Sequence, residues 1–247
     1  MRLIIVDDYE QMSKTAAALV ADVIRSNPHA SLGLTTGNTP IGMYEELSRM
    51  YRANMLSFRH TNIFCLEEYL GVGPEDERSL FSWLSRMFIT PNEIPADHIH
   101  RLRGEDIEPQ RACERFDDTI RRIGGLDLIV EGIGVNGHVG FNEPGSLMES
   151  RCRVVALSKT TLDYNTSYWN AEVPHYGMTV GIGNILEAKE VILMASGHAK
   201  ALPLYHSLQG NVHADVPASY LQHARHLTVI ADKEAAASLA FISEESS

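Results

Sequence analysis

Short apolar runs alternate along the chain with longer segments in which apolar residues recur at every third or fourth position. The short runs predict strands at residues 3–6, 31–34, 62–66, 126–132, 154–157, 179–180, 191–195 and 226–231. The longer segments predict helices at residues 9–25, 40–51, 79–88, 107–123 and 233–242, and a further helix that contains Lys200. Because strands and helices alternate, we expect right-handed crossovers and a mainly parallel sheet between layers of helices.

The alternation continues without an internal repeat, a low-complexity tract or a linker of different composition. We therefore expect one α/β domain over residues 1–247, with a loop-rich middle segment at 91–103. Ligands of open parallel sheets bind beyond the carboxyl ends of the strands. Polar loops leave predicted strand ends, and we expect them to meet at one crevice; they lie at residues 35–39, 67–78 and 134–145, with the turn at 197–200 as a fourth.

Composition and charge narrow the functional classes. The net charge is −11, from 32 acidic residues against 21 Lys and Arg, which disfavours nucleic-acid binding but leaves room for a small anionic ligand. No apolar run reaches the ~18 residues of a membrane span, and the first residues lack the apolar stretch of a signal peptide. Three scattered cysteines, Cys65, Cys113 and Cys152, indicate reduced thiols and a cytoplasmic protein.

The loop after the second predicted strand reads Thr35-Thr36-Gly37-Asn38-Thr39-Pro40. A strand end, a glycine, several hydroxyl groups and a helix N-terminus together favour anion binding, because free backbone N–H groups and the helix dipole point at the loop. The alternative is an ordinary turn in which Thr39 caps the helix and Pro40 occupies its first position. Neither dinucleotide nor P-loop spacing is present.

Glu67 and Glu68 follow the third predicted strand. Adjacent side chains on an extended chain point to opposite faces, so we expect one of the two carboxylates to face the crevice. That carboxylate is a candidate general base whose pKa burial or its neighbour would raise. The alternative is a solvated acidic loop.

The segment GVNGHVGFNEPG, residues 134–145, follows the most apolar predicted strand. Its glycines preclude regular structure and allow the backbone to approach a ligand. Asn136, His138 and Glu143 place three hydrogen-bonding groups on this loop, and the imidazole can transfer protons near neutral pH. The alternative is a structural loop histidine. A serine-hydrolase elbow is absent.

The remaining candidates carry weaker signals. Lys200 could reach an anion in the crevice or lie on the surface, and Arg151 and Arg153 could bind an anion or pair with local acids. The histidines outside the loop lack metal-ligand spacing, so we take them as structural or surface residues and expect no metal.

In order and spacing, LGLTTGNTP, EEYLG, GIGVNGHVGFNEPG and SGHAKA resemble the glucosamine-6-phosphate deaminase (isomerase) family over nearly the whole chain. The G-x-x-G-H-x-x-F-N-E-P string is the specific part, since the related 6-phosphogluconolactonases usually carry Asp-Gly-His and lack F-N-E-P. The resemblance implies a Rossmann-like α/β/α sandwich and conversion of an aldohexosamine 6-phosphate to a ketohexose 6-phosphate and ammonia. It also implies that the protein is a monomer or a homo-oligomer.

The resemblance also assigns roles to individual residues. His138 matches the ring-opening histidine, with Asn136 and Glu143 at the two positions that assist it. Glu67 matches the carboxylate that removes the C2 proton. Substrate phosphate would contact the positions that match the phosphate loop and its lysine, namely Thr36, Gly37, Asn38, Thr39 and Lys200.

The sequence departs from the family pattern at several of these positions. Glu67 stands where aspartate is usual, which moves the carboxylate by roughly 1.5 Å and points to another epimer, such as galactosamine 6-phosphate, or to weak activity. Asn136 replaces an aspartate of some members and cannot stabilise imidazolium by charge. Ser167 stands where a phosphate-binding arginine is expected. Arg153 matches a basic residue of the regulatory site but Val155 replaces a lysine, so we expect no strong activation by N-acetylglucosamine 6-phosphate.

Two alternatives to the deaminase remain at this stage. One is a sugar-phosphate lactonase on the same scaffold, which F-N-E-P disfavours. The other is a non-catalytic sugar-phosphate sensor, which the departure at Glu67 suggests.

Overall fold

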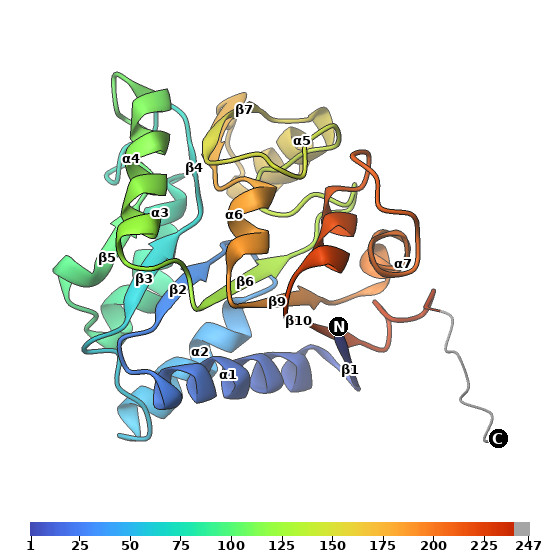
Figure 1. Cartoon of the computed structure of the whole chain (residues 1–247), viewed down its shortest axis with the longest axis horizontal. Coiled ribbons are helices and arrows are strands. Elements are labelled where there is room, and N and C mark those ends of the chain that lie inside the picture. Colours follow the sequence, from blue (N-terminus) through green and yellow to red (C-terminus); the bar gives the residue numbers. More distant parts are fainter. Residues whose placement is uncertain (240–247) are drawn as a thin grey trace.

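A seven-stranded parallel sheet forms the centre of the protein (Figure 1). The computed structural model describes residues 1–239. The strands run in the order β1 (Arg2–Val6), β10 (Leu227–Asp232), β9 (Glu190–Ala195), β6 (Leu128–Gly132), β2 (Ser31–Leu34), β3 (Asn62–Cys65) and β5 (Ile99–Arg101). All six neighbouring pairs are parallel, which confirms the predicted fold class.

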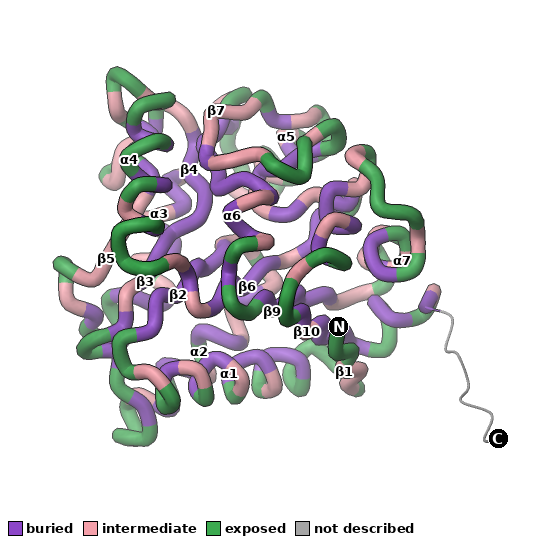
Figure 2. Tube along the Cα trace, viewed as in Figure 1, coloured by how far each residue is buried: buried purple, intermediate pink, exposed green. Residues whose placement is uncertain are grey.

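Helices cover both faces of this sheet. One apolar cluster joins α1 (Tyr9–Ser26) and α2 (Ile41–Arg52) to Leu128 and Val130 of β6. The opposite cluster joins Ile129 of β6 to α4 (Pro109–Arg122), α6 (Ile182–Glu187) and α7 (Ala201–Leu208). Successive side chains of a strand point to opposite faces, so the apolar run Leu128–Val130 at the start of β6 is buried from both sides (Figure 2).

A second, antiparallel sheet lies beside the carboxyl edge of the first and was not predicted. Its order is β4 (Glu67–Tyr69), β8 (Tyr176–Thr179) and β7 (Arg153–Ala156), with Thr179 paired to both Glu67 and Arg153. Only Leu66 separates β3 from β4, so the chain passes directly from one sheet to the other. The polar loop predicted at 67–78 is therefore wrong for its first three residues, because pairing with β8 makes them a strand.

Other differences concern helices. The predicted helix at 79–88 is α3 (Leu80–Leu84), which continues as a π-helical turn (Ser85–Ile89). Short 3-10 segments occupy Thr90–Asn92, Ala96–His98, His198–Lys200 and Pro217–His223. α5 (Lys159–Trp169) was not predicted. Residues 233–238 form turns, so the predicted helix at 233–242 is wrong there, and residues 240–242 lie outside the described residues. Within the described chain, none of the helices has the length and apolarity of a membrane span.

Candidate active site

A pocket opens where the carboxyl ends of β2 and β6 meet the second sheet and α5. Each of the four predicted segments contributes to its lining. The first loop contributes residues 35–39, the second Glu67, and the turn at 197–200 contributes Lys200. The third loop contributes Gly134, Val135, His138, Gly140 and Phe141. Aromatic side chains supply much of the remaining wall, from α3 and α5 in particular: Tyr69, Trp83, Tyr164, Tyr168 and Trp169. The loops converge because the strands that precede them are parallel neighbours.

Glu67 borders the pocket and is almost completely buried. Its Oε1 accepts hydrogen bonds from the Thr35 hydroxyl at 3.2 Å, and from the Thr36 N–H and hydroxyl, both at 3.1 Å. Burial raises the pKa of Glu67 to about 7, because desolvation outweighs the stabilising hydrogen bonds from Thr36 and Thr35. A carboxylate that titrates near neutrality suits removal of a carbon-bound proton.

Glu68 points the other way, as expected for adjacent residues of a strand. Its Oε2 accepts from the Ser79 hydroxyl at 2.6 Å and the Phe81 N–H at 3.1 Å, and its Oε1 accepts from the N–H of Leu80 at 3.0 Å. These groups belong to the first turn of α3, so Glu68 satisfies donors that the helix itself leaves free. Of the two adjacent glutamates, Glu67 is therefore the one that faces the pocket.

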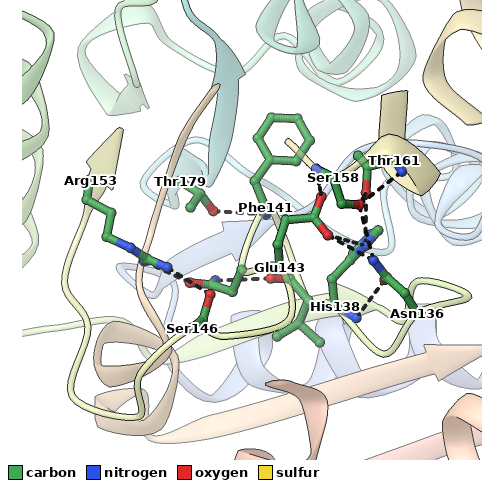
Figure 3. A network of polar contacts seen from close by, with 11 residues as sticks. Asn136, His138, Phe141, Glu143, Ser146, Arg153, Ser158, Thr161 and Thr179 are labelled. Atoms are coloured by element: carbon green, nitrogen blue, oxygen red, sulfur yellow. Dashed lines mark hydrogen bonds and ion pairs between the residues drawn. The ribbon is translucent and has the colours of Figure 1, made fainter. Parts of the chain in front are cut away.

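His138 enters the pocket with Asn136 and Glu143 behind it (Figure 3). Its Nδ1 lies 3.6 Å from Glu143 Oε2 and 3.3 Å from the Thr161 hydroxyl. Asn136 Nδ2 donates to Glu143 Oε2 at 2.9 Å, while Asn136 Oδ1 accepts from the His138 N–H at 3.2 Å. The three residues thus form one network in which only His138 reaches the pocket lining.

Two residues of this network, Ser158 and Thr161, gave no recognisable signal in the sequence. Ser158 caps α5, and its N–H donates to Glu143 Oε1 at 3.1 Å. Burial alone would raise the pKa of Glu143, but hydrogen bonds from His138 and Thr161, the charge of a protonated His138 and the Ser158 N–H lower it to about 2. Glu143 therefore remains ionised and orients the imidazole.

Arg153 of β7 anchors the loop that carries His138 (Figure 3). Arg153 Nη1 donates to Asn142 Oδ1 at 2.9 Å and its Nη2 donates to the Ser146 hydroxyl at 3.0 Å. Asn142 Nδ2 in turn donates to the carbonyls of Val139 and Val180, and the Phe141 N–H donates to the Thr179 hydroxyl. The F-N-E-P segment is thereby fixed to the second sheet.

The loop Thr36-Gly37-Asn38-Thr39 also lines the pocket. α2 begins at Ile41 after Pro40, and no side chain caps it with a hydrogen bond, so the alternative in which Thr39 is the cap is wrong. Gly37 has φ 93°, a conformation that favours glycine. A glycine-containing loop before a helix N-terminus is a common place for anions to bind, but the N–H and hydroxyl of Thr36 already donate to Glu67.

Lys200 also lines the pocket and brings a positive charge to it. Burial lowers its pKa, and none of the carboxylates in the described chain forms an ion pair with it. The turn before it is held because the Gly197 N–H donates to Asp232 at 3.0 Å. Ser167, which occupies the position of the expected arginine, is exposed on α5 and lies outside the pocket lining. Among the described residues, no cluster of side chains with metal-binding composition is found.

Comparison with known proteins identifies the family of the chain. A family model described as glucosamine-6-phosphate isomerases/6-phosphogluconolactonase matches residues 7–230. The chain belongs to this family. Two glucosamine-6-phosphate deaminases are similar to this member of the family. The protein from Bacillus pumilus (strain SAFR-032) is 40% identical over 237 residues, covering 95% of this chain and 98% of the relative. Deaminase 2 of Bacillus subtilis (strain 168) is 39% identical over 243 residues, covering 97% and 98%.

Solved structures extend the comparison. A monomeric glucosamine-6-phosphate deaminase superposes with a TM-score of 0.94 at 35% identity, covering 97% of this chain and all of the other. The 6-phosphogluconolactonase of Trypanosoma brucei gives a TM-score of 0.79 at 19% identity, with 97% and 98% coverage, so it shares the fold of this family member.

Proposed function

We propose that the protein is an amino-sugar 6-phosphate deaminase and isomerase, which acts as one α/β domain over residues 1–247 without a metal or organic cofactor. Its substrate is glucosamine 6-phosphate or an epimer such as galactosamine 6-phosphate. The observation that carries the proposal is one pocket lined by a buried carboxylate, Glu67, an oriented imidazole, His138, the loop before α2, and a lysine, Lys200.

The residues divide the reaction among them. The loop at Thr36–Thr39 and Lys200 bind the phosphate and thereby fix the position of the sugar in the pocket. His138, oriented by Glu143 and Asn136, exchanges a proton between the anomeric hydroxyl and the ring oxygen, which opens the ring. Glu67 then removes the C2 proton; the C–H electron pair forms the C1–C2 double bond, and the carbonyl oxygen at C1 takes a proton from the substrate's own ammonium group, which gives an enolamine. The Glu67 carboxyl returns its proton to C1, which leaves an iminium group at C2. Water adds to C2 and the C–N bond breaks, so that ammonia leaves and the ketohexose 6-phosphate remains.

Three observations, one on a solved relative and two on this chain, support related proposals. The monomeric solved relative favours a monomer, and three buried free cysteines favour a cytoplasmic location. Arg153 is engaged by Asn142 and Ser146 rather than free to receive a regulatory sugar phosphate. This supports the expectation of weak or no activation by N-acetylglucosamine 6-phosphate.

The proposal is tested by offering the purified protein three substrates: glucosamine 6-phosphate, galactosamine 6-phosphate and 6-phosphogluconolactone. We expect ammonia and ketohexose 6-phosphate from at least one amino sugar. Lactone hydrolysis that survives Glu67→Gln, without ammonia release, would instead identify a lactonase. Tight binding of an amino-sugar phosphate without turnover would identify a sensor.

Removal of the Lys200 charge should weaken substrate binding more than it slows the chemical step. Charged hydrogen bonds contribute about 1.5–3 kcal/mol, so we expect Lys200→Ala to raise KM roughly 10- to 100-fold with a smaller change in kcat. Lys189, which pairs with Asp127 at the surface, provides the control Lys189→Ala. A loss of kcat at unchanged KM would contradict the phosphate-binding role of Lys200.

Gly134 should tolerate no side chain, because the imidazole of His138 passes over it. A Cβ built on Gly134 would lie 2.4 Å from His138 Cε1. A displacement of about 1 Å can cost on the order of 100-fold in rate, so we expect a loss of that size in kcat/KM for Gly134→Ala. At Gly73 the nearest atom to a new Cβ is 3.6 Å away, and Gly73→Ala should retain full activity. Equal activity of the two variants would contradict the close packing at Gly134.

A further inference from the structure

Two buried glutamates beside the pocket have carboxyl oxygens without a hydrogen-bond partner. They are Glu67, through Oε2, and Glu131 of β6, through both oxygens. Glu131 is completely buried, and nothing in the sequence motifs singled it out. A buried polar atom without a partner is uncommon in proteins and calls for an explanation.

The two carboxyl groups border the same small space beside Gly140. The position that a Cβ on Gly140 would occupy lies 3.6 Å from Glu67 Oε2 and 3.7 Å from Glu131 Oε1. Because residue 140 is glycine, it places no side chain of its own in that space, and the Thr179 hydroxyl, 3.0 Å from the same position, donates to the Val180 carbonyl. An unpartnered oxygen of the proposed base and an unpartnered oxygen of Glu131 therefore border the same space.

Two ionised carboxylates cannot share such a site without a large electrostatic cost. A protonated carboxyl is a hydrogen-bond donor, whereas an ionised one only accepts. One proton on the pair therefore gives both groups a partner.

The surroundings decide which group holds the proton. Glu67 Oε1 accepts three hydrogen bonds, which stabilise its charge. Burial raises the pKa of Glu131 well above its ordinary value, and the charge of Glu67 raises it further, while the Gly140 N–H lowers it too little to compensate. The Thr35 hydroxyl donates its one hydrogen to Glu67. Glu131 is therefore the protonated member.

We propose that Glu131 is a positioning residue whose carboxyl proton is donated to Glu67 Oε2 and holds the enolisation carboxylate in place. This inference rests on the proposed function of Glu67. With Oε1 held by Thr35 and Thr36 and Oε2 held by Glu131, the carboxylate is fixed at both ends. When the C2 proton moves to Glu67, the C–H electron pair enters the enol and the proton on Glu131 stays where it is.

Other ionisable groups around the pair are already engaged or lie across the pocket. The Tyr44 hydroxyl donates to the Thr35 carbonyl, Glu68 accepts from the first turn of α3, and the Tyr69 hydroxyl accepts from Trp169. The Cys65 thiol donates to the Glu67 carbonyl. His138 and Lys200 line the same pocket as Glu67.

The pH dependence of kcat/KM tests this assignment with two substitutions. Glu131→Gln keeps a donor for Glu67 Oε2, so its acidic limb should stay where it is in the unmodified enzyme. Glu131→Leu removes the donor, and loss of a hydrogen bond to a charged group should move the limb upward by roughly 1–2 pH units. Asp117→Asn is the matched control, because Asp117 is a buried carboxylate that contacts Asn184 and Arg151 outside the pocket. A limb that Glu131→Leu leaves unmoved or lowers would overturn the proposal.

Infrared difference titration gives a readout that does not need activity. At mildly alkaline pH, the unmodified protein and Glu67→Gln should keep the carbonyl band of a buried carboxylic acid, and Glu131→Gln should lose it. Absence of that band from a folded, active enzyme would overturn the inference alone. If the band is present but the protein releases no ammonia, the assignment of the proton to Glu131 stands and the proposed function is rejected.

Discussion

Replacing Glu67 by glutamine should lower kcat for ammonia release by roughly 10²- to 10⁴-fold. Glutamine has nearly the same shape and can still contact Thr35 and Thr36, but it cannot accept the C2 proton. The acidic limb of kcat/KM should lie near pH 7 in the unmodified enzyme, because the pKa of Glu67 is raised to about 7 and the base must be ionised to act. Activity therefore rises as pH increases through 7, and this limb should vanish from the residual activity of Glu67→Gln.

Two further variants separate chemistry from folding at this position. Glu67→Asp keeps the charge but withdraws the carboxylate by roughly 1.5 Å, so it should retain a partial activity that depends on the epimer offered. Glu105→Gln removes a carboxylate that pairs with Arg101 near the surface and should leave the rate unchanged. An activity of Glu67→Gln within a few-fold of the unmodified enzyme would exclude Glu67 as the base.

Replacing His138 by alanine should reduce ammonia release by roughly 10²- to 10⁴-fold for a different reason. The pyranose ring would have to open without a group that exchanges protons at the anomeric hydroxyl and the ring oxygen. The residual rate of His138→Ala should equal the rate at which the sugar ring opens spontaneously. The rate of Glu67→Gln should stay low however much open-chain sugar is present. Ammonia release is measured at increasing enzyme concentration, at which the rate with His138→Ala should reach a plateau.

His29 offers a matched control for this experiment. It is exposed and stacks on His60 with ring centroids 5.0 Å apart, so His29→Gln removes an imidazole without touching the pocket. If His138→Ala and His29→Gln were equally active, ring opening would need another acid and base.

The parallel sheet was predictable because its strands are apolar on both faces, as β6 and β9 show. The second sheet was not, since β4 has three residues, two of them carboxylates, and its pairing with β8 joins segments about a hundred residues apart in the sequence. α5 escaped prediction because its polar sequence, KTTLDYNTSYW, has one buried residue, Thr161, and hence no apolar periodicity. The C-terminal residues 233–238 are rich in alanine, yet they form turns.

The candidate site, like the fold, could be predicted only in part. Each of the loops Thr36–Thr39 and Asn136–Glu143 is one short segment, so the sequence alone shows that the polar groups within each loop lie close together. Thr161 and Ser158 reach His138 and Glu143 only through the docking of α5. Glu131 lies in β6 and Glu67 in β4 of the other sheet, and both border the space beside Gly140, a proximity that only the fold can show.

A crystal structure with an open-chain amino-sugar alcohol 6-phosphate tests the central claim most directly. The account predicts its phosphate on the Thr36–Thr39 loop beside Lys200, its C2 within about 3.5 Å of a Glu67 oxygen, and its C1 end toward His138. A ligand bound away from Glu67, or one whose phosphate lies against His138, would contradict it.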